Sequence, residues 1–276
     1  MIDFEGKKME SIKFDIIIPV FRDKRIIRAI KSVRAADRTD SCKLIIVDGD
    51  PVERSPLFSS VSSLLKPDDL YIHGPDKGIW DALNKGLDAS TSACVGWIGS
   101  DDMFSRNFRP DLMLRLLDEY SADALIASTV FFDGKSLQRG FSPPRISYKN
   151  GGNIPHYSSF WRRSVIGQQR FDCAIKYAAD LKFFYELMVV KGIRHISLPV
   201  VTTFMELGGI TNQGTLNKIK QNMECFKIYR QFQGFASSTI AVTGKVGSKL
   251  LWMNDHVNED TYTLFNETIK TATCEK

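Results

Sequence analysis

Residues 14–20 read Phe-Asp-Ile-Ile-Ile-Pro-Val, a short apolar run that is rich in β-branched side chains. Such a run predicts a strand that is buried on both faces of a parallel sheet. Residues 26–33 follow with apolar side chains at helical spacing, and residues 43–47 (Lys-Leu-Ile-Ile-Val) form another apolar run. This segment therefore predicts a β-α-β unit with a right-handed crossover.

The same alternation continues toward the middle of the chain. Further strands are predicted at 69–72, 93–98 and 124–132, and further helices at 56–65, 79–89 and 109–120. Strands that alternate with helices predict an α/β fold of the doubly wound, Rossmann-like kind, with a mostly parallel central sheet.

The second half of the chain is less regular. It predicts a loop at 141–153, a strand at 157–161, a helix at 180–191, one or two strands in 193–203, a Gly-rich loop at 207–214 and a helix at 215–234. No internal repeat or low-complexity tract is present, and the pattern after residue 234 is ambiguous.

Composition and charge narrow the class of protein. With 276 residues, of which 43% are hydrophobic and 25% charged, the chain is long enough and apolar enough to fold. The net charge of +5 suits phosphates or anionic lipid, but no dense Lys/Arg run with interleaved aromatics indicates nucleic acid. The five cysteines are scattered and odd in number, which favours free thiols over disulfides or zinc.

The N-terminus is polar, without the apolar core of a signal peptide, and no window has the roughly 18 apolar residues of a membrane span. The prediction is a cytoplasmic protein that could touch the inner face of the cell membrane.

Three acidic residues follow buried strands of the predicted sheet. Asp48 comes after the strand at 43–47, and Asp101 and Asp102 come after the strand at 93–98. They should meet at the carboxyl edge of the sheet, where ligands of this fold bind. The adjacent pair offers hard oxygen ligands for Mg²⁺ or Mn²⁺, or caps a turn; Asp48 could accept hydrogen bonds from a base or ribose, or hold its own turn.

Four other residues can carry chemistry. Asp76 and Lys77 lie in a polar loop before the helix at 79–89, where Asp76 could cap the helix and Lys77 could reach a phosphate. Asp180 opens a helix, as an N-cap, a general base, or both. The pattern around His156 does not separate a structural from a catalytic role.

Taken together, these segments resemble inverting glycosyltransferases of family 2, which have the GT-A fold. The resemblance covers residues 14–214, and its most diagnostic stretch, residues 75–86 (Pro-Asp-Lys-Gly-Ile-Trp-Asp-Ala-Leu-Asn-Lys-Gly), is close to the bacterial polysaccharide branch. The other matching stretches, in order, are 17–20 (Ile-Ile-Pro-Val), 47–49 (Val-Asp-Gly), 99–102 (Gly-Ser-Asp-Asp), 154–160 (Ile-Pro-His-Tyr-Ser-Ser-Phe), 178–180 (Ala-Ala-Asp) and 207–211 (Leu-Gly-Gly-Ile-Thr).

The resemblance implies a role for each matching position. Asp102 would ligate Mn²⁺ or Mg²⁺, Asp101 would contact the ribose or diphosphate, and Asp48 would contact the base. Pro19 and Val20 would line the nucleotide pocket, and Asp76 and Lys77 would complete the donor site. Asp180 would be the catalytic base.

The implied activity is transfer of a sugar from a nucleotide-sugar, UDP-linked by expectation, to an acceptor hydroxyl with inversion. The acceptor would be a saccharide or a lipid-linked saccharide, in cell-surface polysaccharide or glycolipid biosynthesis. A GT-A domain is expected at 1–214, with a nucleotide-binding part at 14–132 and an acceptor part at 133–214. A helical C-terminal extension is expected at 215–276.

The chain departs from the family pattern at two places. Phe21-Arg22 stands where Tyr-Asn is common, and Asp50-Pro51 stands where the family usually has a Gly/Ser/Thr-rich loop. In the helix at 215–234, core packing through Leu216, Ile219, Met223 and Phe226 is favoured over a membrane-surface role with Lys218, Lys220, Lys227 and Arg230 near lipid headgroups, because the basic residues are not confined to one face.

Two other functions share features of this sequence. A nucleotide-sugar binding module without catalysis would keep the donor site, yet all the acidic positions are present. A dinucleotide-dependent oxidoreductase shares the alternating pattern but needs a Gly-x-Gly-x-x-Gly turn after the first strand. Residues 19–23 read Pro-Val-Phe-Arg-Asp there, which excludes that class.

Overall fold

The computed structural model of the chain describes residues 14–53, 55–134, 136–143, 147–152, 154–208, 215–251 and 257–273. The polar N-terminus, Asn153, Cys274 and positions 209–214 of the predicted Gly-rich loop lie outside these residues.

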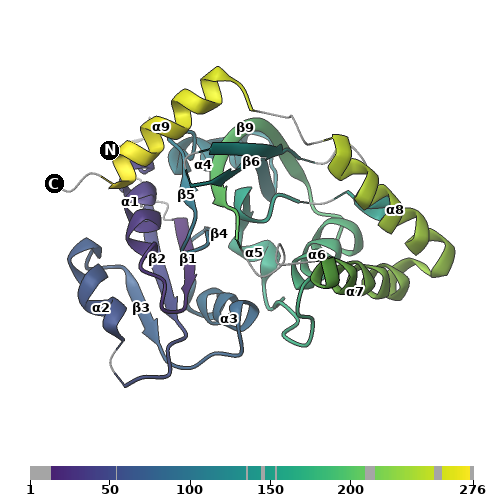
Figure 1. Cartoon of the computed structure of the whole chain (residues 1–276), viewed down its shortest axis with the longest axis horizontal. Coiled ribbons are helices and arrows are strands. Elements are labelled where there is room, and N and C mark those ends of the chain that lie inside the picture. The colour runs from purple at the N-terminus through teal and green to yellow at the C-terminus, as the bar shows by residue number, and fades with distance from the viewer. Residues whose placement is uncertain are drawn as a thin grey trace.

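One mixed sheet organises the described part of the chain (Figure 1). The strands lie in the order β3-β2-β1-β4-β8-β6-β9-β5, and β7 pairs with β6. Their bounds are β1 (Phe14–Val20), β2 (Cys42–Asp48), β3 (Leu70–His73), β4 (Cys94–Trp97), β5 (Met103–Phe104), β6 (Ala124–Asp133), β7 (Ser136–Phe141), β8 (Ser159–Arg162) and β9 (His195–Glu206). β1 to β4 pair in parallel, whereas β8 runs antiparallel to β4 and β6. The predicted α/β fold with a mostly parallel sheet is confirmed.

Helices cover both faces of this sheet. They are α1 (Ile26–Ala36), α2 (Pro56–Val61), α3 (Ile79–Ala89), α4 (Pro110–Glu119), α5 (Arg163–Ile166), α6 (Ala179–Tyr185), α7 (Thr215–Gln233), α8 (Phe235–Leu251) and α9 (Glu259–Thr273). The shorter turns are the 3₁₀ helices η1 (Ser62–Leu64), η2 (Tyr148–Asn150) and η3 (His156–Ser158), and the π-helical turn η4 (Glu186–Val190).

Alternate side chains of β1 enter different hydrophobic clusters, as the period of two along a strand requires. Ile16 and Ile18 pack with α1, α2 and α4, whereas Ile17 packs with α3 and α6. Both faces of β1 are therefore buried, which explains its uninterrupted apolar sequence.

The C-terminal helices separate into two places. α7 and α8 pack against each other beside α6 and η2, at the right of Figure 1, while α9 returns to pack on α1 and β5. Within the described residues, no helix combines the length and the hydrophobicity needed to cross a bilayer.

Several predicted elements differ from the structure. β5, β7 and α5 were not predicted, because two- to six-residue elements leave little periodicity to detect. The helix predicted at 180–191 is α6 followed by η4, and the predicted strand at 157–161 begins as η3.

The prediction for the core-facing side of α7 was wrong. The helix does pack on the core, but through Cys225, Ile228 and Tyr229. Leu216, Ile219 and Met223 are instead 72%, 51% and 56% exposed. Both sides of α7 are apolar enough to pack, so periodicity alone did not decide which one faces inward.

Gly86 lets α3 lie close to β1. A Cβ at this position would stand 2.3 Å from Cγ2 of the buried Ile17. We expect Gly86→Ala to lower the free energy of unfolding by about 1–3 kcal/mol, because overpacking outweighs the gain of up to about 1 kcal/mol in helix propensity.

Denaturant unfolding monitored by circular dichroism would measure the Gly86→Ala effect. Gly247→Ala is the matched control, because Gly247 lies in α8 and a Cβ there meets nothing within 4 Å. That control should stabilise the protein by about 0.5–1 kcal/mol. Equal, stabilising effects of both substitutions would contradict close packing at Gly86.

Candidate functional site

Four parallel strands end at the same edge of the sheet, and backbone hydrogen bonds tie their ends together. The Gly49 N–H donates to the Val20 carbonyl at 3.0 Å, and the Gly74 N–H donates to the Asp48 carbonyl at 3.1 Å. The loops that follow β1, β2, β3 and β4 therefore gather where ligands of an open α/β sheet bind.

Asp101 and Asp102 lie in the turn directly after β4. Asp102 is 1% exposed, and its Oδ1 accepts a hydrogen bond from the Glu206 N–H at 2.9 Å. Its Oδ2 is buried and has no hydrogen-bond partner among the described residues. Gly99 leaves room for both carboxylates, since a Cβ there would stand 2.5 Å from Oδ2 of Asp102 and 2.9 Å from Oδ1 of Asp101.

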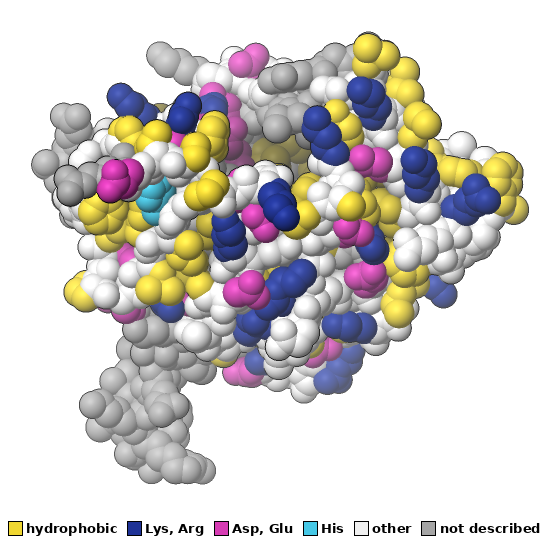
Figure 2. All heavy atoms as spheres, turned by 90° about the horizontal axis from the view of Figure 1, so that it is seen from below, with side chains coloured by type: hydrophobic (Ala, Val, Ile, Leu, Met, Phe, Trp, Pro, Cys, Tyr) yellow, Lys and Arg dark blue, Asp and Glu magenta, His cyan; other side chains and the backbone are white. Residues whose placement is uncertain are grey.

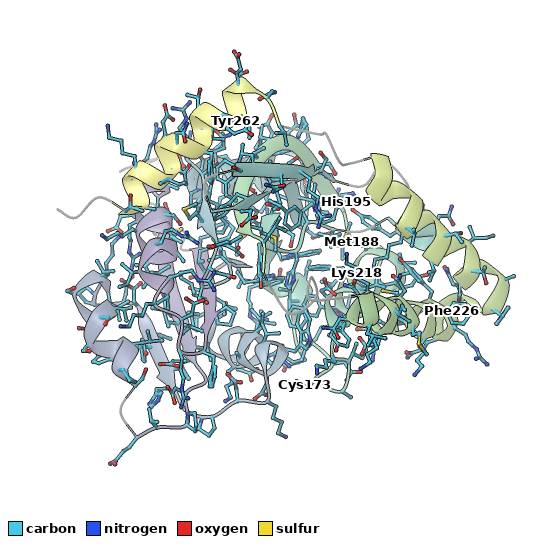
Figure 3. The ribbon with its side chains drawn as sticks, viewed as in Figure 1. Cys173, Met188, His195, Lys218, Phe226 and Tyr262 are labelled. Carbon is cyan, nitrogen blue, oxygen red and sulfur yellow. The ribbon has the colours of Figure 1, made fainter. Side chains whose placement is uncertain are left out.

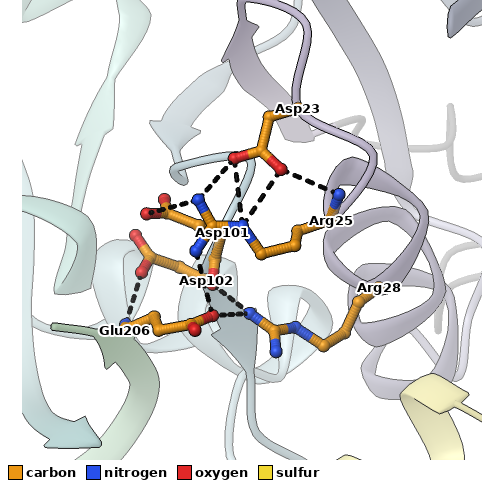
Figure 4. Close-up of polar contacts among 6 residues, drawn as sticks. All are labelled: Asp23, Arg25, Arg28, Asp101, Asp102 and Glu206. Atoms are coloured by element: carbon orange, nitrogen blue, oxygen red, sulfur yellow. Dashed lines mark hydrogen bonds and ion pairs between the residues drawn. The ribbon is translucent and has the colours of Figure 1, made fainter. Parts of the chain in front are cut away.

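Two arginines and two further acids surround this pair (Figure 4). Arg28 forms an ion pair with Glu206 at 2.5 Å and donates to the Asp101 carbonyl. Arg25 lies 2.8 Å from Asp23, 3.4 Å from Glu206 and 3.8 Å from the Asp101 carboxylate. The carboxylates of Asp23, Asp101 and Glu206 thus share two guanidinium groups, and the Asp102 carboxylate makes no ion pair among the described residues. The cluster therefore contains more acidic than basic side chains.

The carboxylate pair fits a divalent cation. Burial raises the pKa of Asp101, and it raises that of Asp102 well above the usual value, with a further increase from the charge of Asp101. A buried carboxylate oxygen without a hydrogen bond is costly unless a cation compensates it. Mg²⁺ and Mn²⁺ bind such oxygens, often through one or two carboxylates plus substrate phosphates.

Asp180 lies in the first turn of α6. Ala178 is the N-cap of that helix, so Asp180 does not hold the N-cap position. Its Oδ1 accepts from the Leu181 N–H at 2.8 Å, and its Oδ2 lies 3.9 Å from His156 Nδ1. The Asp180 side chain remains 24% exposed and can therefore meet a ligand.

His156 is packed among aromatic rings. It stacks on Trp80 and Tyr157, and burial lowers its pKa to about 4. The imidazole is therefore neutral near pH 7, and its Nε2 has no hydrogen-bond partner among the described residues.

Tyr157 connects the two groups of carboxylates. Burial raises the pKa of its hydroxyl, and the charges of Asp102, Asp101 and Asp180 raise it further. Asp180 and the Asp101-Asp102 pair thus act on the same phenol from separate elements, after β4 and at the start of α6.

Asp48 is completely buried at the end of β2. Its Oδ2 accepts hydrogen bonds from the hydroxyls of Ser55 and Tyr71, and its Oδ1 accepts from the Asp50 N–H at 3.1 Å. The turn-holding alternative thus describes what Asp48 does in this structure. A direct contact with a base would require one of these hydrogen bonds to be exchanged.

The two departures from the family pattern contact each other. Arg22 Nε and Nη2 donate to the Asp50 carboxylate at 2.9 and 3.1 Å, and this bidentate pair lowers the pKa of Asp50. The Arg22 guanidinium also lies over the ring of Phe21, which is 59% exposed. The substitutions are therefore complementary and join the loops that follow β1 and β2.

The loop before α3 lies beside the loop after β2. A Cβ on Gly49 would stand 2.0 Å from Oδ2 of Asp76, so only glycine allows this approach. Asp76 accepts from the Gly78 N–H, and the Lys77 N–H donates to Asp81. Asp76 thus reaches the edge of the sheet, while the Lys77 side chain is exposed.

Comparison of the sequence with protein families places this geometry in a known class. The profile of the family described as glycosyl transferase family 2 matches residues 15–173, more than half of the chain. The chain belongs to this family. The matched segment of this glycosyltransferase runs from β1 to the residues just after α5, and includes the Asp101-Asp102 turn.

Curated relatives of this family 2 glycosyltransferase include mycobacterial proteins. The "PGL/p-HBAD biosynthesis glycosyltransferase" of Mycobacterium bovis is 24% identical over 215 residues, which cover 74% of this chain and 81% of the relative. A Mycobacterium tuberculosis protein with the same description matches equally well.

Solved structures of glycosyltransferases share the fold. S. aureus TarS 1-349 in complex with UDP-GlcNAc has a TM-score of 0.62 at 14% identity, covering 94% of this chain and 81% of that one. The mannosyltransferase PcManGT from Pyrobaculum calidifontis, in complex with GDP-Man and Mn²⁺, has a TM-score of 0.57 at 12% identity, covering 95% and 81%. The chain spans 49% of the longer S. aureus TarS chain. The predicted GT-A fold is confirmed.

Sequence reasoning did not assign site positions to Arg25, Arg28 and Glu206. One signal was available: Arg25 is the N-cap of α1 and Arg28 lies in its first turn, which contains no acid. Cations at a helix N-terminus are electrostatically unfavourable, so their presence there indicates acidic neighbours from elsewhere in the fold. Glu206 gave no comparable signal, because its approach to Asp102 depends on a sheet contact across more than 100 residues.

Proposed function

We propose that this family 2 glycosyltransferase moves a sugar from a UDP-sugar to an acceptor hydroxyl with inversion at the anomeric carbon. The observation that carries the proposal is that two acidic sites lie near Tyr157. One is the buried Asp101-Asp102 turn, in which one carboxylate oxygen has no hydrogen-bond partner among the described residues. The other is Asp180, which is separate and accessible.

Asp102 would hold Mn²⁺ or Mg²⁺ through Oδ2, with Asp101 beside it toward the ribose or diphosphate. The bound cation would act as a Lewis acid that stabilises the charge of the departing nucleoside diphosphate. Glu206 and Gly99 keep the Asp102 carboxylate in place, through a backbone hydrogen bond and the absence of a side chain.

Asp180 would take the proton from the acceptor hydroxyl, which is a weak nucleophile until it is deprotonated. The proposed base lies on α6, and the proposed phosphate site lies after β4. This separation suits direct displacement of the nucleoside diphosphate by the acceptor, which inverts the anomeric carbon. The neutral His156 beside Asp180 adds no positive charge that would weaken the base.

The donor site would occupy the part of the chain at 14–132, and the acceptor site the part at 133–214. Pro19 and Val20 would line the nucleotide pocket, with Asp48, Asp76 and Lys77 on the neighbouring loops. Because Asp48 is enclosed by Ser55 and Tyr71, it would shape the base pocket, directly or through these hydroxyls.

The acceptor would be a saccharide or a lipid-linked saccharide, in the assembly of a cell-surface polysaccharide or glycolipid. The mycobacterial relatives named for PGL/p-HBAD biosynthesis support the glycolipid alternative. Such an enzyme would work in the cytoplasm at the inner face of the membrane.

Calorimetric titration with nucleoside diphosphates tests the donor assignment. We expect UDP to bind at least about tenfold more tightly with Mn²⁺ than without, because the cation joins the diphosphate to the Asp101-Asp102 pair. GDP and ADP are the matched controls for the base. Tighter binding of GDP than of UDP would reject the UDP assignment. An affinity for UDP that is the same with and without Mn²⁺ would reject the metal site.

Turnover distinguishes the enzyme from a non-catalytic binding module. Metal-dependent UDP binding without any donor hydrolysis or transfer, across a panel of UDP-sugars and saccharide acceptors, would favour the module.

A further inference from the structure

α7 carries a stripe of apolar and basic side chains on the side that is turned away from the rest of the described chain, and only Phe226 in it meets a ring of another helix. We define the α7 outer face by its seven residues: Leu216, Ile219, Lys220, Met223, Phe226, Lys227 and Arg230. Leu216, Ile219 and Met223 are more than half exposed, and a shallow groove runs along the stripe from Ile219 to Arg230. A contiguous exposed apolar stripe that is rimmed by charged side chains is a candidate interaction site.

The α7 outer face is the side opposite to the one that packs. At about 100° per residue, Cys225, Ile228 and Tyr229 lie on the reverse side of the helix from Met223 and Lys227. The first three are 0–3% exposed against α6. α7 is therefore already anchored by one apolar side, and the second is not needed to hold the helix in the fold.

The charged side chains of α7 also differ between its outer and inner sides. Three of its four basic residues, Lys220, Lys227 and Arg230, lie on the α7 outer face, whereas Lys218 lies outside it; the one acid is Glu224. Glu224 is used inward: its carboxylate accepts hydrogen bonds from the backbone N–H groups of residues 176–178, at 3.2, 2.7 and 3.1 Å. The α7 outer face thus presents positive charge without a compensating acid.

α8 extends the same surface. It contains no Asp or Glu, and Phe235, at its start, is 68% exposed and lies edge-on to Phe226 at 5.5 Å. Figure 2 shows hydrophobic and Lys or Arg side chains together at the right of the view, the side on which Figure 1 places α7 and α8. Figure 3 labels Phe226, together with Lys218, on α7.

We propose that the α7 outer face docks on an anionic lipid bilayer. Apolar side chains that alternate with Lys and Arg suit the interface of a membrane, where the former enter the acyl boundary and the latter meet lipid phosphates. A second copy of this chain fits less well, because pairing two such stripes would bring Lys220, Lys227 and Arg230 against their like-charged counterparts.

Docking on this face would place α6, which carries Asp180, behind α7, one helix diameter of about 10–12 Å from the lipid surface. Glu224 joins α7 to residues 176–178, and the Tyr177 hydroxyl donates to Asn217 of α7 at 3.2 Å. Asp180 follows directly in the chain. If Asp180 is the base, as proposed above, the acceptor hydroxyl would be delivered from the membrane, which selects a lipid-linked acceptor. The docking itself does not depend on that role.

Co-sedimentation of the full chain with vesicles tests the proposal. We expect binding to vesicles of mixed phosphatidylglycerol and phosphatidylcholine, weakening as salt is raised, and little binding to phosphatidylcholine alone. The triple variant Lys220→Glu, Lys227→Glu, Arg230→Glu should bind anionic vesicles about 100-fold more weakly. The triple variant Leu216→Ser, Ile219→Ser, Met223→Ser should lose at least about tenfold.

The matched control reverses three charges elsewhere: Arg38→Glu, Lys43→Glu, Arg115→Glu. It changes net charge equally and should leave most of the binding intact. Equal losses in both charge variants would reduce the effect to overall charge and overturn a docking face. Absence of binding to anionic vesicles would overturn it too.

Sedimentation velocity without lipid distinguishes the remaining occupant. A dimer that the Leu216, Ile219, Met223 variant dissociates would assign the α7 outer face to a second copy and overturn the proposal. Because vesicle binding needs no donor or acceptor, it can succeed or fail independently of the proposed transferase activity. An unchanged circular dichroism spectrum and thermal unfolding transition of each variant would show that it has folded.

Discussion

Asp180→Asn should lower kcat by about 10²–10⁴-fold and leave the affinity for UDP and Mn²⁺ unchanged. The amide keeps the shape of the carboxylate and can still accept the Leu181 N–H at Oδ1, so α6 should fold as before. It cannot take a proton from the acceptor. Steady-state transfer with a responsive acceptor would give kcat, and calorimetry would give the nucleotide affinity.

Asp172→Asn is the control for the Asp180 substitution. Asp172 lies on the same segment and pairs with Lys182 at 2.7 Å, away from the Asp101-Asp102 pair. Its loss should cost little activity, because a partly exposed ion pair contributes up to about 1 kcal/mol to stability. If Asp180→Asn kept full turnover, another residue would have to be the catalytic base. If it also lost UDP binding, the variant would be misfolded.

The nucleotide half of the fold could be predicted because its signals are local. Each strand from β1 to β4 is an apolar run followed by a polar turn, and each helix carries its own periodicity. Asp101 and Asp102 could be placed at the edge of the sheet by the same logic, since the carboxyl ends of parallel strands meet there. Their position directly after a buried strand was enough to predict this location.

The environment of these residues could not be predicted, because it is made by distant contacts. Glu206 reaches Asp102 only through the pairing of β9 with β6 and β5, and Arg22 meets Asp50 only because β1 and β2 are neighbours. Asp48 is another case: its position left open whether it contacts a ligand or holds its own turn, and the pattern did not reveal the hydroxyls of Ser55 and Tyr71 that enclose its carboxylate.

α7 shows a different limit. Helical periodicity identifies apolar stripes but does not say which of two stripes faces inward. The inward side of α7 is set by Glu224, whose carboxylate accepts hydrogen bonds from residues 176–178. It is also set by Tyr229, whose ring centroid lies 5.8 Å from that of Tyr185. These are tertiary contacts of single side chains, and they leave Leu216, Ile219 and Met223 outside.

Asp102→Asn should lower transfer by at least about 10²–10³-fold and, at the same time, stabilise the metal-free protein. The loss follows because an amide is a poor ligand for Mn²⁺, so UDP binding should no longer respond to the ion. The gain follows because the carboxylate is buried with an unsatisfied Oδ2 beside Asp101, an arrangement that costs folding free energy.

The two effects separate a metal ligand from a structural residue. Asn can keep the hydrogen bond from the Glu206 N–H through its carbonyl, so the turn after β4 should be retained. We expect the free energy of unfolding without metal to rise by about 1–2 kcal/mol, and the stabilisation that Mn²⁺ and UDP give the parent protein to disappear. Thermal unfolding with and without Mn²⁺ and UDP measures both.

Asp111→Asn is the control for the Asp102 substitution, since Asp111 pairs with Arg109 at 2.7 Å on α4 and lies outside the cluster in Figure 4. It should leave the Mn²⁺ response unchanged. If Asp102→Asn instead destabilised the metal-free protein and kept that response, Asp102 would be a structural residue of the turn. A buried carboxylate without a hydrogen-bond partner does not stabilise the fold by itself. If Asp102 holds a cation, as proposed, its cost in folding free energy has a functional reason.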